Sequence, residues 1–201
     1  TTEIYTLSLH DALPILDEKF ALPGFHNIVR RDRPNAVGGG VAIFVSRSFV
    51  VKRRIDLEVP DLEMLWCEVR LHNHKFLFGV IYRPPNSLTS FWDKFQDSID
   101  LAKATGINNI VISGDLNADP ETLPGNKLNT LVTSNFLNIH VKEPKRITQE
   151  TATCLDQIIS NIPNFIGNVR VLPPIANCDH SVVGASLCLG ARRNLYITDE
   201  S

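Results

Sequence analysis

The sequence has 201 residues, of which 43% are hydrophobic and 21% are charged, and its formal net charge is −2. These values are typical of one globular domain with a real core, and they exclude a strongly basic protein that holds nucleic acid by bulk charge. No apolar run approaches the roughly 20 residues of a membrane span. The four cysteines form no C-x-x-C pair, which favours a reduced, intracellular setting.

Residues 1–15 resemble a translated sequencing adapter rather than natural protein. We therefore expect them to lie outside the domain, which would cover 16–190 and be followed by a C-terminal tail, 191–201. On this interpretation the genuine chain begins part-way through a domain. The alternative is an ordinary amphipathic segment in which His10 and Asp11 form a catalytic pair.

Apolar runs between turn residues predict a chain dominated by strands. The expected strands are 41–45, 64–71, 76–82, 110–113, 137–141, 154–159, 169–172 and 181–189. Every second residue of 64–71, beginning at Leu65, is apolar, which predicts a strand with one apolar face. The polar tip 72–75 separates it from 76–82, so these two strands are expected to form a hairpin.

One helix is expected to begin at Ser90, where Ser90 and Asp93 form a capping box, and to end at Gly106. Its apolar stripe consists of Phe91, Phe95, Ile99 and Ala102. A second helix is expected across 126–135. Because strands outnumber helices and hairpins mix with helical crossovers, we expect two packed sheets flanked by helices.

The run 110–113 ends in Gly-Asp-Leu-Asn, and this stretch is the strongest candidate for chemistry. In an α/β fold the ligand crevice lies outside the carboxyl ends of strands. Asp115 and Asn117 are two residues apart, so both point into that crevice if the backbone stays extended. Asp115 would accept a proton and Asn117 would donate to an oxygen. The alternative is an Asx-type turn, because Asp, Asn, Gly and Pro are ordinary turn residues.

Asp156 lies within an otherwise apolar strand and therefore needs a partner, because an unpaired buried carboxylate is costly. His180, which follows Asp179 just before the last strand, is the candidate. Asp156 would then fix the tautomer of the His180 ring. The alternative is a chance Asp-His dipeptide in a turn. Tyr82 ends its strand and either places its phenol in the same crevice or is a core aromatic with a wet end.

Six motifs follow one another along the chain. They are Gly-Gly-Gly-Val-Ala-Ile (38–43), Val-Ile-Tyr-Arg-Pro-Pro (80–85), Gly-Asp-Leu-Asn (114–117), Arg-Ile-Thr (146–148), Leu-Asp-Gln-Ile-Ile (155–159) and Cys-Asp-His-Ser (178–181). With these motifs the sequence resembles the endonuclease/exonuclease/phosphatase (DNase I-like) superfamily, and most of all the endonuclease domain of a non-LTR retrotransposon. The resemblance implies an α+β fold, a four-layer α/β/β/α sandwich, and Mg²⁺-dependent phosphodiester hydrolysis, with Mn²⁺ as an alternative cation.

The resemblance also implies roles for single residues. Asp115 would position or deprotonate the attacking water, and Asn117 would hold water and phosphate. His180 would bind the scissile phosphate, with Asp156 behind it.

Three further residues complete the implied site: Asp179 close to the metal, and Tyr82 and Thr148 hydrogen-bonded to the phosphate. In-line attack on a diester needs an oriented water, a cation, and donors on the non-bridging oxygens. The implied residues supply this chemistry. Mg²⁺ keeps several waters and takes only one or two carboxylates, so few protein ligands suffice.

The sequence departs from the family pattern at two places. Cys178 stands where the family has Ser, which removes a hydroxyl donor. The family's first strand, and the metal-binding Glu that follows it, would precede Leu16, where the adapter-like residues stand. Glu3 is the only glutamate there, and its surroundings do not match. We therefore expect an N-terminally truncated domain that lacks its principal metal ligand and hydrolyses DNA poorly or not at all.

The implied partner is DNA, which the retrotransposon branch nicks so that a reverse transcriptase domain of the same polyprotein can prime from the nick. An intracellular, nuclear location follows from that role, without a membrane. Two alternatives stay open. One is another enzyme of the superfamily, such as an abasic-site nuclease or a phosphatase, and the other is a non-catalytic remnant.

Overall fold

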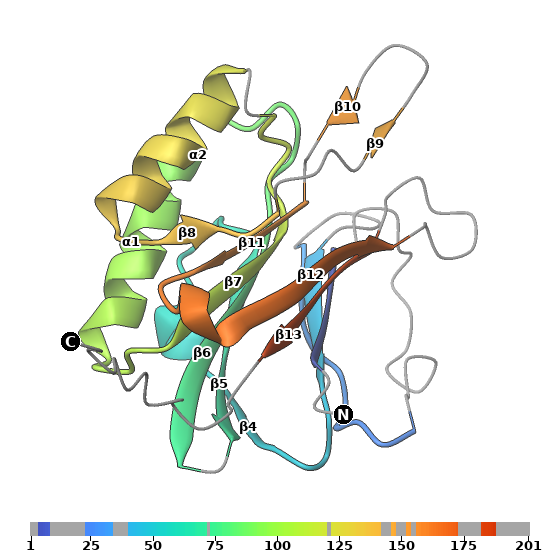
Figure 1. Ribbon diagram of the computed structural model, residues 1–201. Coiled ribbons are helices and arrows are strands. Elements are labelled where there is room, and N and C mark those ends of the chain that lie inside the picture. The colour runs from blue at the N-terminus through green and yellow to red at the C-terminus, as the bar shows by residue number, and fades with distance from the viewer. Residues whose placement is uncertain are drawn as a thin grey trace, which may run out of the picture.

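The computed structural model describes residues 4–8, 23–33, 40–71, 73–119, 122–141, 146–147, 152–153, 156–172 and 182–187. Figure 1 shows these residues as a stack of layers. Helices α1 (Ser90–Ala104) and α2 (Leu123–Ser134) lie against one face of a central sheet, and shorter strands lie on its other side. The two packed sheets and the helical layer on one side are therefore present. The second outer helical layer of the expected sandwich is not among the described residues.

The central sheet has six strands in the order β4-β5-β6-β7-β11-β8. Their bounds are Val50–Arg53 (β4), Met64–Leu71 (β5), His74–Tyr82 (β6), Ile110–Asp115 (β7), Asn138–Ile139 (β8) and Asp156–Ser160 (β11). Strands β5 and β6 form the expected hairpin. Strands β6 and β7 are parallel, and α1 makes the crossover between them that parallel pairing requires.

Helix α1 forms because its apolar residues recur at helical spacing and become buried. The expected capping box is absent, because Thr89 already has helical backbone angles and Ser90 is the first residue of the helix. Helix α2 begins before its expected start. The Thr122 side chain accepts a hydrogen bond from the Gly125 N–H at 3.4 Å, and Pro124 fits the first turn. Neither described helix is long and apolar enough to cross a membrane.

The remaining strands form three smaller groups: a β1-β3-β2 sheet, a β12-β13 pair and a β9-β10 pair. Their bounds are Ile4–Ser8 (β1), Val29–Asp32 (β2), Gly40–Val45 (β3), Arg146–Ile147 (β9), Ala152–Thr153 (β10), Ile166–Leu172 (β12) and Val182–Leu187 (β13). Two short 3-10 helices, Ile55–Leu57 (η2) and Pro163–Phe165 (η3), lie between strands. All expected strands are present, although the strand expected at 137–141 is reduced to β8.

Strand β1 lies inside residues 1–15, which we expected to be outside the domain. It pairs antiparallel with β3 along all five of its residues, and it also contacts β6 and β7. In the structure these five residues therefore belong to a sheet. The physical reason is that a strand edge pairs through backbone groups, so an extended segment of any origin can cover it. The resemblance of residues 1–15 to an adapter stays a prediction.

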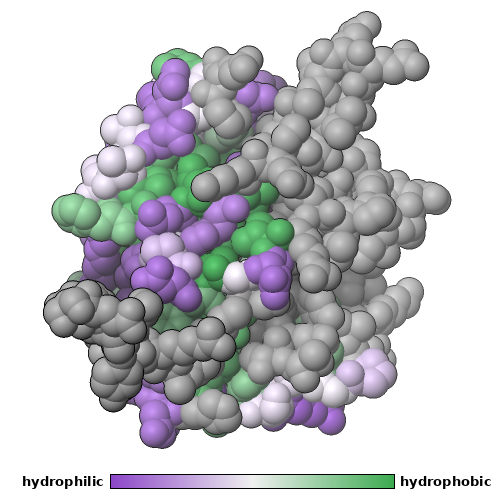
Figure 2. Space-filling view, viewed as in Figure 1, coloured by the Kyte–Doolittle hydropathy of each residue, from purple (hydrophilic) through white to green (hydrophobic). Residues whose placement is uncertain are grey.

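The central sheet is buried on both faces near the middle of β5. Met64 and Trp66 pack in the core shared with the helices, whereas Leu65 and Cys67 pack in the core shared with β3. All four side chains are 0% exposed. The prediction of a single apolar face is therefore wrong for this part of the strand, because a sheet covered on both sides has no solvent face there. In Figure 2, hydrophilic residues lie mostly along the outer edge of the helical layer, on the left, and hydrophobic residues lie toward the middle of the view.

Candidate active site

Tyr82, Asp115 and Asp156 lie side by side at the ends of three neighbouring strands. Tyr82 is opposite Asp115 in the parallel β6–β7 pair, and Asp156 is opposite Asp115 in the antiparallel β7–β11 pair. Residues directly opposite each other project to the same face of a sheet. That face is the one toward the smaller strands, since Tyr82 packs in their core. Tyr82 and Asp115 are buried, and Asp156 is half-buried.

Asn117 follows Asp115 in a tight turn. Its backbone φ is +41°, and its N–H donates to Asp115 Oδ1 at 2.9 Å, which is an Asx turn. The expectation of an extended backbone is therefore wrong here, and the alternative interpretation describes the local structure. The turn nevertheless places Asn117 on the Asp115 carboxylate, because a left-handed residue folds the chain back toward the preceding side chain.

The side chain of Asn117 uses both of its N–H groups within the protein. Nδ2 donates to the Arg83 carbonyl at 2.8 Å and to Asp115 Oδ2 at 3.3 Å. An amide has only these two donors and one carbonyl acceptor. In this arrangement Asn117 can offer its side-chain oxygen, Oδ1, to a water. This differs from the expectation that Asn117 donates a hydrogen bond to an oxygen.

Gly114 allows β7 to approach β6 closely enough for Tyr82 to align with Asp115. Its φ is +151°, and a Cβ at this position would overlap the carbonyl of Ile81. A side chain would therefore push the two strands apart at the residue that precedes Asp115. The glycine of the Gly-Asp-Leu-Asn motif thus has a specific structural role in forming the site.

An ion pair between Arg33 and Glu63 lies beside Tyr82. Arg33 donates through Nε to Glu63 Oε1 at 2.7 Å and through Nη2 to Oε2 at 3.2 Å. The Gly40 N–H also donates to Oε2, at 3.1 Å. A two-bond pair of this kind fixes the orientation of the guanidinium. It holds the Arg33 guanidinium carbon 5.8 Å from the centre of the Tyr82 ring.

The Tyr82 hydroxyl is held in its protonated form. Burial raises its pKa, because it disfavours the phenolate, and the negative charge of Asp115 raises the pKa further. Arg33 acts in the opposite direction. Tyr82 can therefore donate a hydrogen bond at neutral pH, which is the property required of a group that binds an anionic oxygen.

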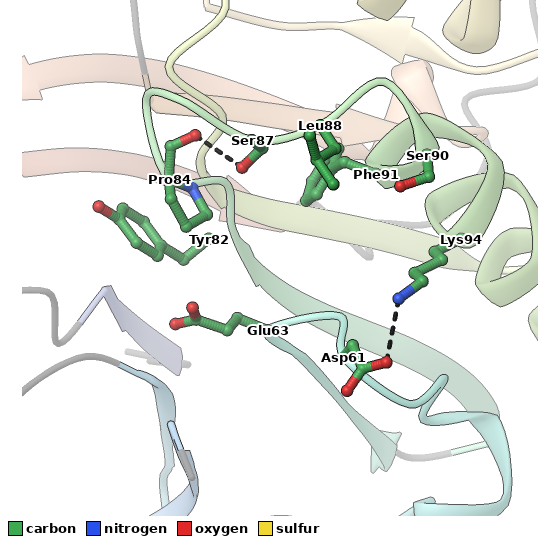
Figure 3. Close-up of a pocket in the computed structure, with 9 residues that line it drawn as sticks. All are labelled: Asp61, Glu63, Tyr82, Pro84, Ser87, Leu88, Ser90, Phe91 and Lys94. Atoms are coloured by element: carbon green, nitrogen blue, oxygen red, sulfur yellow. Dashed lines mark hydrogen bonds and ion pairs between the residues drawn. The ribbon is translucent and has the colours of Figure 1, made fainter. Parts of the chain in front are cut away.

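A cavity of about 260 Å³ opens beside Tyr82 (Figure 3). The loop after β6, with Leu88, forms one wall, and the segment before β5, with Asp61 and Glu63, forms the other. Lys94 of α1 is paired with Asp61 at 3.2 Å. In Figure 3 the Tyr82 hydroxyl and the Glu63 carboxylate lie at the end of the cavity away from Lys94. A group bound at Tyr82 would therefore have room to extend into this cavity.

The described residues do not by themselves form a metal centre. They contain no group of three or more His, Cys, Asp or Glu residues placed to hold an ion. Glu63, which lines the cavity, already accepts hydrogen bonds from Arg33 and Gly40. A Mg²⁺ ligand must offer oxygen to the ion. The predicted ligand Asp179 lies outside the described residues, so the expected metal site stays a prediction.

Several solved structures share this arrangement of sheets and helices. The endonuclease domain of TRAS1, a telomere-specific non-LTR retrotransposon, gives a TM-score of 0.68 at 15% identity over 85% of this chain and 83% of that one. A 3′-5′ exonuclease from Neisseria meningitidis gives 0.66 at 14% identity, over 92% and 89% of the two chains. The human Nocturnin catalytic domain gives 0.57 at 17% identity, over 92% and 80%. The chain has the DNase I-like fold.

The sequence matches no protein-family model and no curated protein. The likeness in structure concerns the DNase I-like fold, and the same fold can carry different activities. The residues of the site, rather than the fold, therefore decide the activity.

Four of the predicted site residues come together in this DNase I-like fold: Tyr82, Asp115, Asn117 and Asp156. The other predicted residues, Thr148, Asp179 and His180, lie outside the described residues, and so does Cys178. The hydrogen bond between Asp156 and the His180 ring accordingly stays a prediction.

Three residues near the site were not predicted from the sequence: Arg33, Glu63 and Arg83. Arg33 belongs to none of the six motifs, and Glu63 precedes a strand without any motif of its own. Arg83 stood inside a recognised motif, between Tyr82 and two prolines. A cation directly after a buried strand was the signal that could have drawn attention to it.

Proposed function

We propose that this chain is a nuclease domain that hydrolyses one phosphodiester bond of DNA and so produces a nick. The proposal extends to an endonuclease domain of a non-LTR retrotransposon, which in the parent polyprotein would be joined to a reverse transcriptase. The six ordered motifs and the fold shared with the TRAS1 endonuclease domain support this choice. A nuclear location belongs to the same proposal, because the substrate would be chromosomal DNA.

The observation that carries the proposal is the row formed by Tyr82, Asp115 and Asp156 across three strand ends. A protonated phenol next to two carboxylates combines a donor for a phosphate oxygen with an acceptor for a proton. Hydrolysis of a diester needs both kinds of group close together. Buried carboxylates are costly to the fold, so a reaction is a better account of this cluster than stability.

In this proposal Asp115 accepts the proton of the attacking water, and the side-chain oxygen of Asn117 helps to orient that water. The Tyr82 hydroxyl donates to a non-bridging oxygen of the phosphate. His180, oriented by Asp156, and Thr148 would contact the same phosphate.

A divalent cation, Mg²⁺ or Mn²⁺, belongs to the proposal as the group that would take up developing negative charge on the phosphate. Asp179 is the proposed ligand. Its position lies outside the described residues, so none of the roles given to Tyr82, Asp115 and Asn117 depends on the position of that ion.

A plasmid-nicking assay tests the proposal. Supercoiled DNA is mixed with an excess of the purified chain and Mg²⁺, and relaxed circles are followed over hours, because the described residues alone form no metal centre and the rate is expected to be low. We expect relaxed circles with the unaltered chain and none with Asp115→Ala. No nicking with either cation, together with no binding to labelled duplex DNA, would overturn the proposal. Release of phosphate from monoesters in the absence of nicking would instead favour a phosphatase.

A further inference from the structure

Arg83 is a buried cation that lies between helix α1 and the Asp115–Asn117 turn. Only 4% of its surface is exposed. Its guanidinium carbon lies 5.7 Å from the centre of the Phe91 ring and 5.4 Å from that of Trp92, and both rings belong to the first turn of α1. A guanidinium lies over aromatic rings more often than an ammonium does. The two rings are perpendicular to each other, so the guanidinium plane can stack on at most one of them.

Arg83 contacts the turn through both its backbone and its side chain. Its N–H donates to the Asp115 carbonyl at 2.8 Å, and its carbonyl accepts from Asn117 Nδ2 at 2.8 Å. Any residue except proline could make these two backbone bonds at position 83. The Arg83 side chain adds a third contact, because its Nη1 donates to the backbone carbonyl of Asn117 at 3.0 Å. The Leu116 carbonyl lies at 3.4 Å from the same nitrogen.

The position of Arg83 carries a cost. Its Nε is buried and has no hydrogen-bond partner among the residues that the structure describes. Burial also lowers the pKa of the guanidinium, while the charge of Asp115 opposes this shift. An apolar side chain of similar length would avoid both costs, although it would leave the Asp115 carboxylate without this opposite charge. A role for Arg83 is therefore better sought in what it holds than in stability.

We propose that Arg83 is a positioning residue that fixes Asn117 on the carboxylate of Asp115, a role that rests on the function proposed above. By binding the backbone carbonyl of Asn117, the guanidinium holds this residue at its left-handed φ of +41°. Asn is among the non-glycine residues that adopt this region most readily, and the bond from Arg83 adds a restraint that holds the turn. Arg83 itself is shielded from solvent and acts through Asn117, without touching the substrate.

Two variants and one control test this role. Arg83→Met keeps the length of the side chain and removes the donors, whereas Arg83→Lys keeps the charge and N–H donors but lacks the planar guanidinium. Arg47→Met, at an exposed position, is the control. In NMR spectra of the whole chain, the Asn117 side-chain amide is identified by its loss in Asn117→Ser. We expect its two proton signals to be separate and slow to exchange in the unaltered chain, and to collapse toward the values of an exposed amide in Arg83→Met.

Activity and stability are measured on the same samples. We expect the single-turnover nicking rate of Arg83→Met to fall about 100-fold, as a displaced catalytic group predicts, and Arg83→Lys to recover part of the loss. The DNA concentration that gives half the maximal rate should be the same in Arg83→Met as in the unaltered chain, because the guanidinium does not reach the substrate. The thermal midpoint of unfolding should stay within about 4 °C of the unaltered chain.

An unchanged Asn117 amide signal in Arg83→Met, or a loss of rate that follows the thermal midpoint across the variants, would overturn the inference. Absence of nicking and of DNA binding in the unaltered chain would overturn the proposed function instead. In that case the Asn117 amide signal would still decide whether Arg83 holds the turn.

Discussion

Asp115 and Asp156 lie directly opposite each other across the antiparallel β7–β11 pair. Like charges at opposite positions of a sheet repel, and Asp115 is only 2% exposed, so water screens the repulsion poorly. Two donors of Asn117 bind the Asp115 carboxylate, and the positive charge of Arg83 lies close enough to interact with it. The site is therefore a cluster of charged and polar side chains within an otherwise apolar sheet. Each of these groups can be removed by a single substitution.

Replacing Asp115 by Asn removes the proposed proton acceptor and keeps the shape of the side chain. We expect the single-turnover nicking rate to fall at least about 100-fold, the usual contribution of a general base. The fold should hold, because an Asn side-chain oxygen can still accept from the Asn117 N–H and the repulsion with Asp156 is relieved. Asp97→Asn, on the exposed face of α1, is the control. Equal losses in both variants, or nicking by Asp115→Asn at the full rate, would contradict the assignment.

Asp156→Asn tests the proposed pairing with His180. We expect nicking to fall by orders of magnitude with the fold intact, because an amide favours the wrong tautomer of the ring; the corresponding change in a hydrolase triad lowers the rate about 10⁴-fold. Residues that act as a unit are not additive, so the double variant with Asp115→Asn should be little worse than either single variant. Unchanged activity in Asp156→Asn would refute the orienting role.

Arg33 lies over the ring of Tyr82, whose hydroxyl is proposed to bind the phosphate. We expect Arg33→Gln to weaken binding to duplex DNA and to reduce the slope of log affinity against log salt by about one. Arg47→Gln is the matched control. Fluorescence anisotropy at several salt concentrations measures both quantities. An identical slope in Arg33→Gln and the unaltered chain would show that Arg33 serves only Glu63.

The proposed metal requirement is tested by removal and return. We expect excess EDTA to abolish nicking and added Mg²⁺ to restore it, because the developing charge on the phosphate then regains its cation. Asp179→Asn should raise the Mg²⁺ concentration needed for half-maximal rate, since a carboxylate ligand becomes a neutral amide. Full activity in excess EDTA, or a Mg²⁺ requirement that is the same in Asp179→Asn, would contradict the respective part of the proposal.

Cys67 links stability to alkaline pH. Its thiol is fully buried, and burial raises its pKa to about 12, whereas an unfolded thiol has a pKa of about 8.5. Because the pKa is higher in the folded state, the contribution to stability is complete below the unfolded value and is lost as pH rises toward the folded one. We expect the urea midpoint of unfolding to fall with pH above about 8.5 and to fall less steeply in Cys67→Ala. Parallel slopes for the two chains would show that Cys67 is not responsible.

The same burial predicts that Cys67 is protected from alkylation. Thiols react as thiolates, and the folded state disfavours that form. Mass spectrometry of the peptide that contains Cys67 should show modification by iodoacetamide in urea and none under native conditions. Rapid native modification would show that this part of the β5 strand opens.

The order and type of most elements could be predicted from the sequence. Apolar spacing over Phe91 to Ala102 predicted α1, and the run before Gly114 predicted β7, because each pattern reflects which face of a local element is buried. The cap at the start of α1 could not be predicted from the sequence, because it depends on the backbone angles of Thr89. The two-sided burial of β5 was also not visible, because it depends on which elements cover the sheet.

The sequence by itself determined which residue types stand at the strand ends, and hence that Asp115, Asn117, Asp156 and Tyr82 were candidates. Only the tertiary structure decided that these residues meet, because strand register between distant segments is set by packing and turn geometry rather than by local pattern. The placement of Arg83 depended on it as well. A cation can be buried there only because two rings of α1 and the carbonyls of the 115–117 turn surround it in the folded chain.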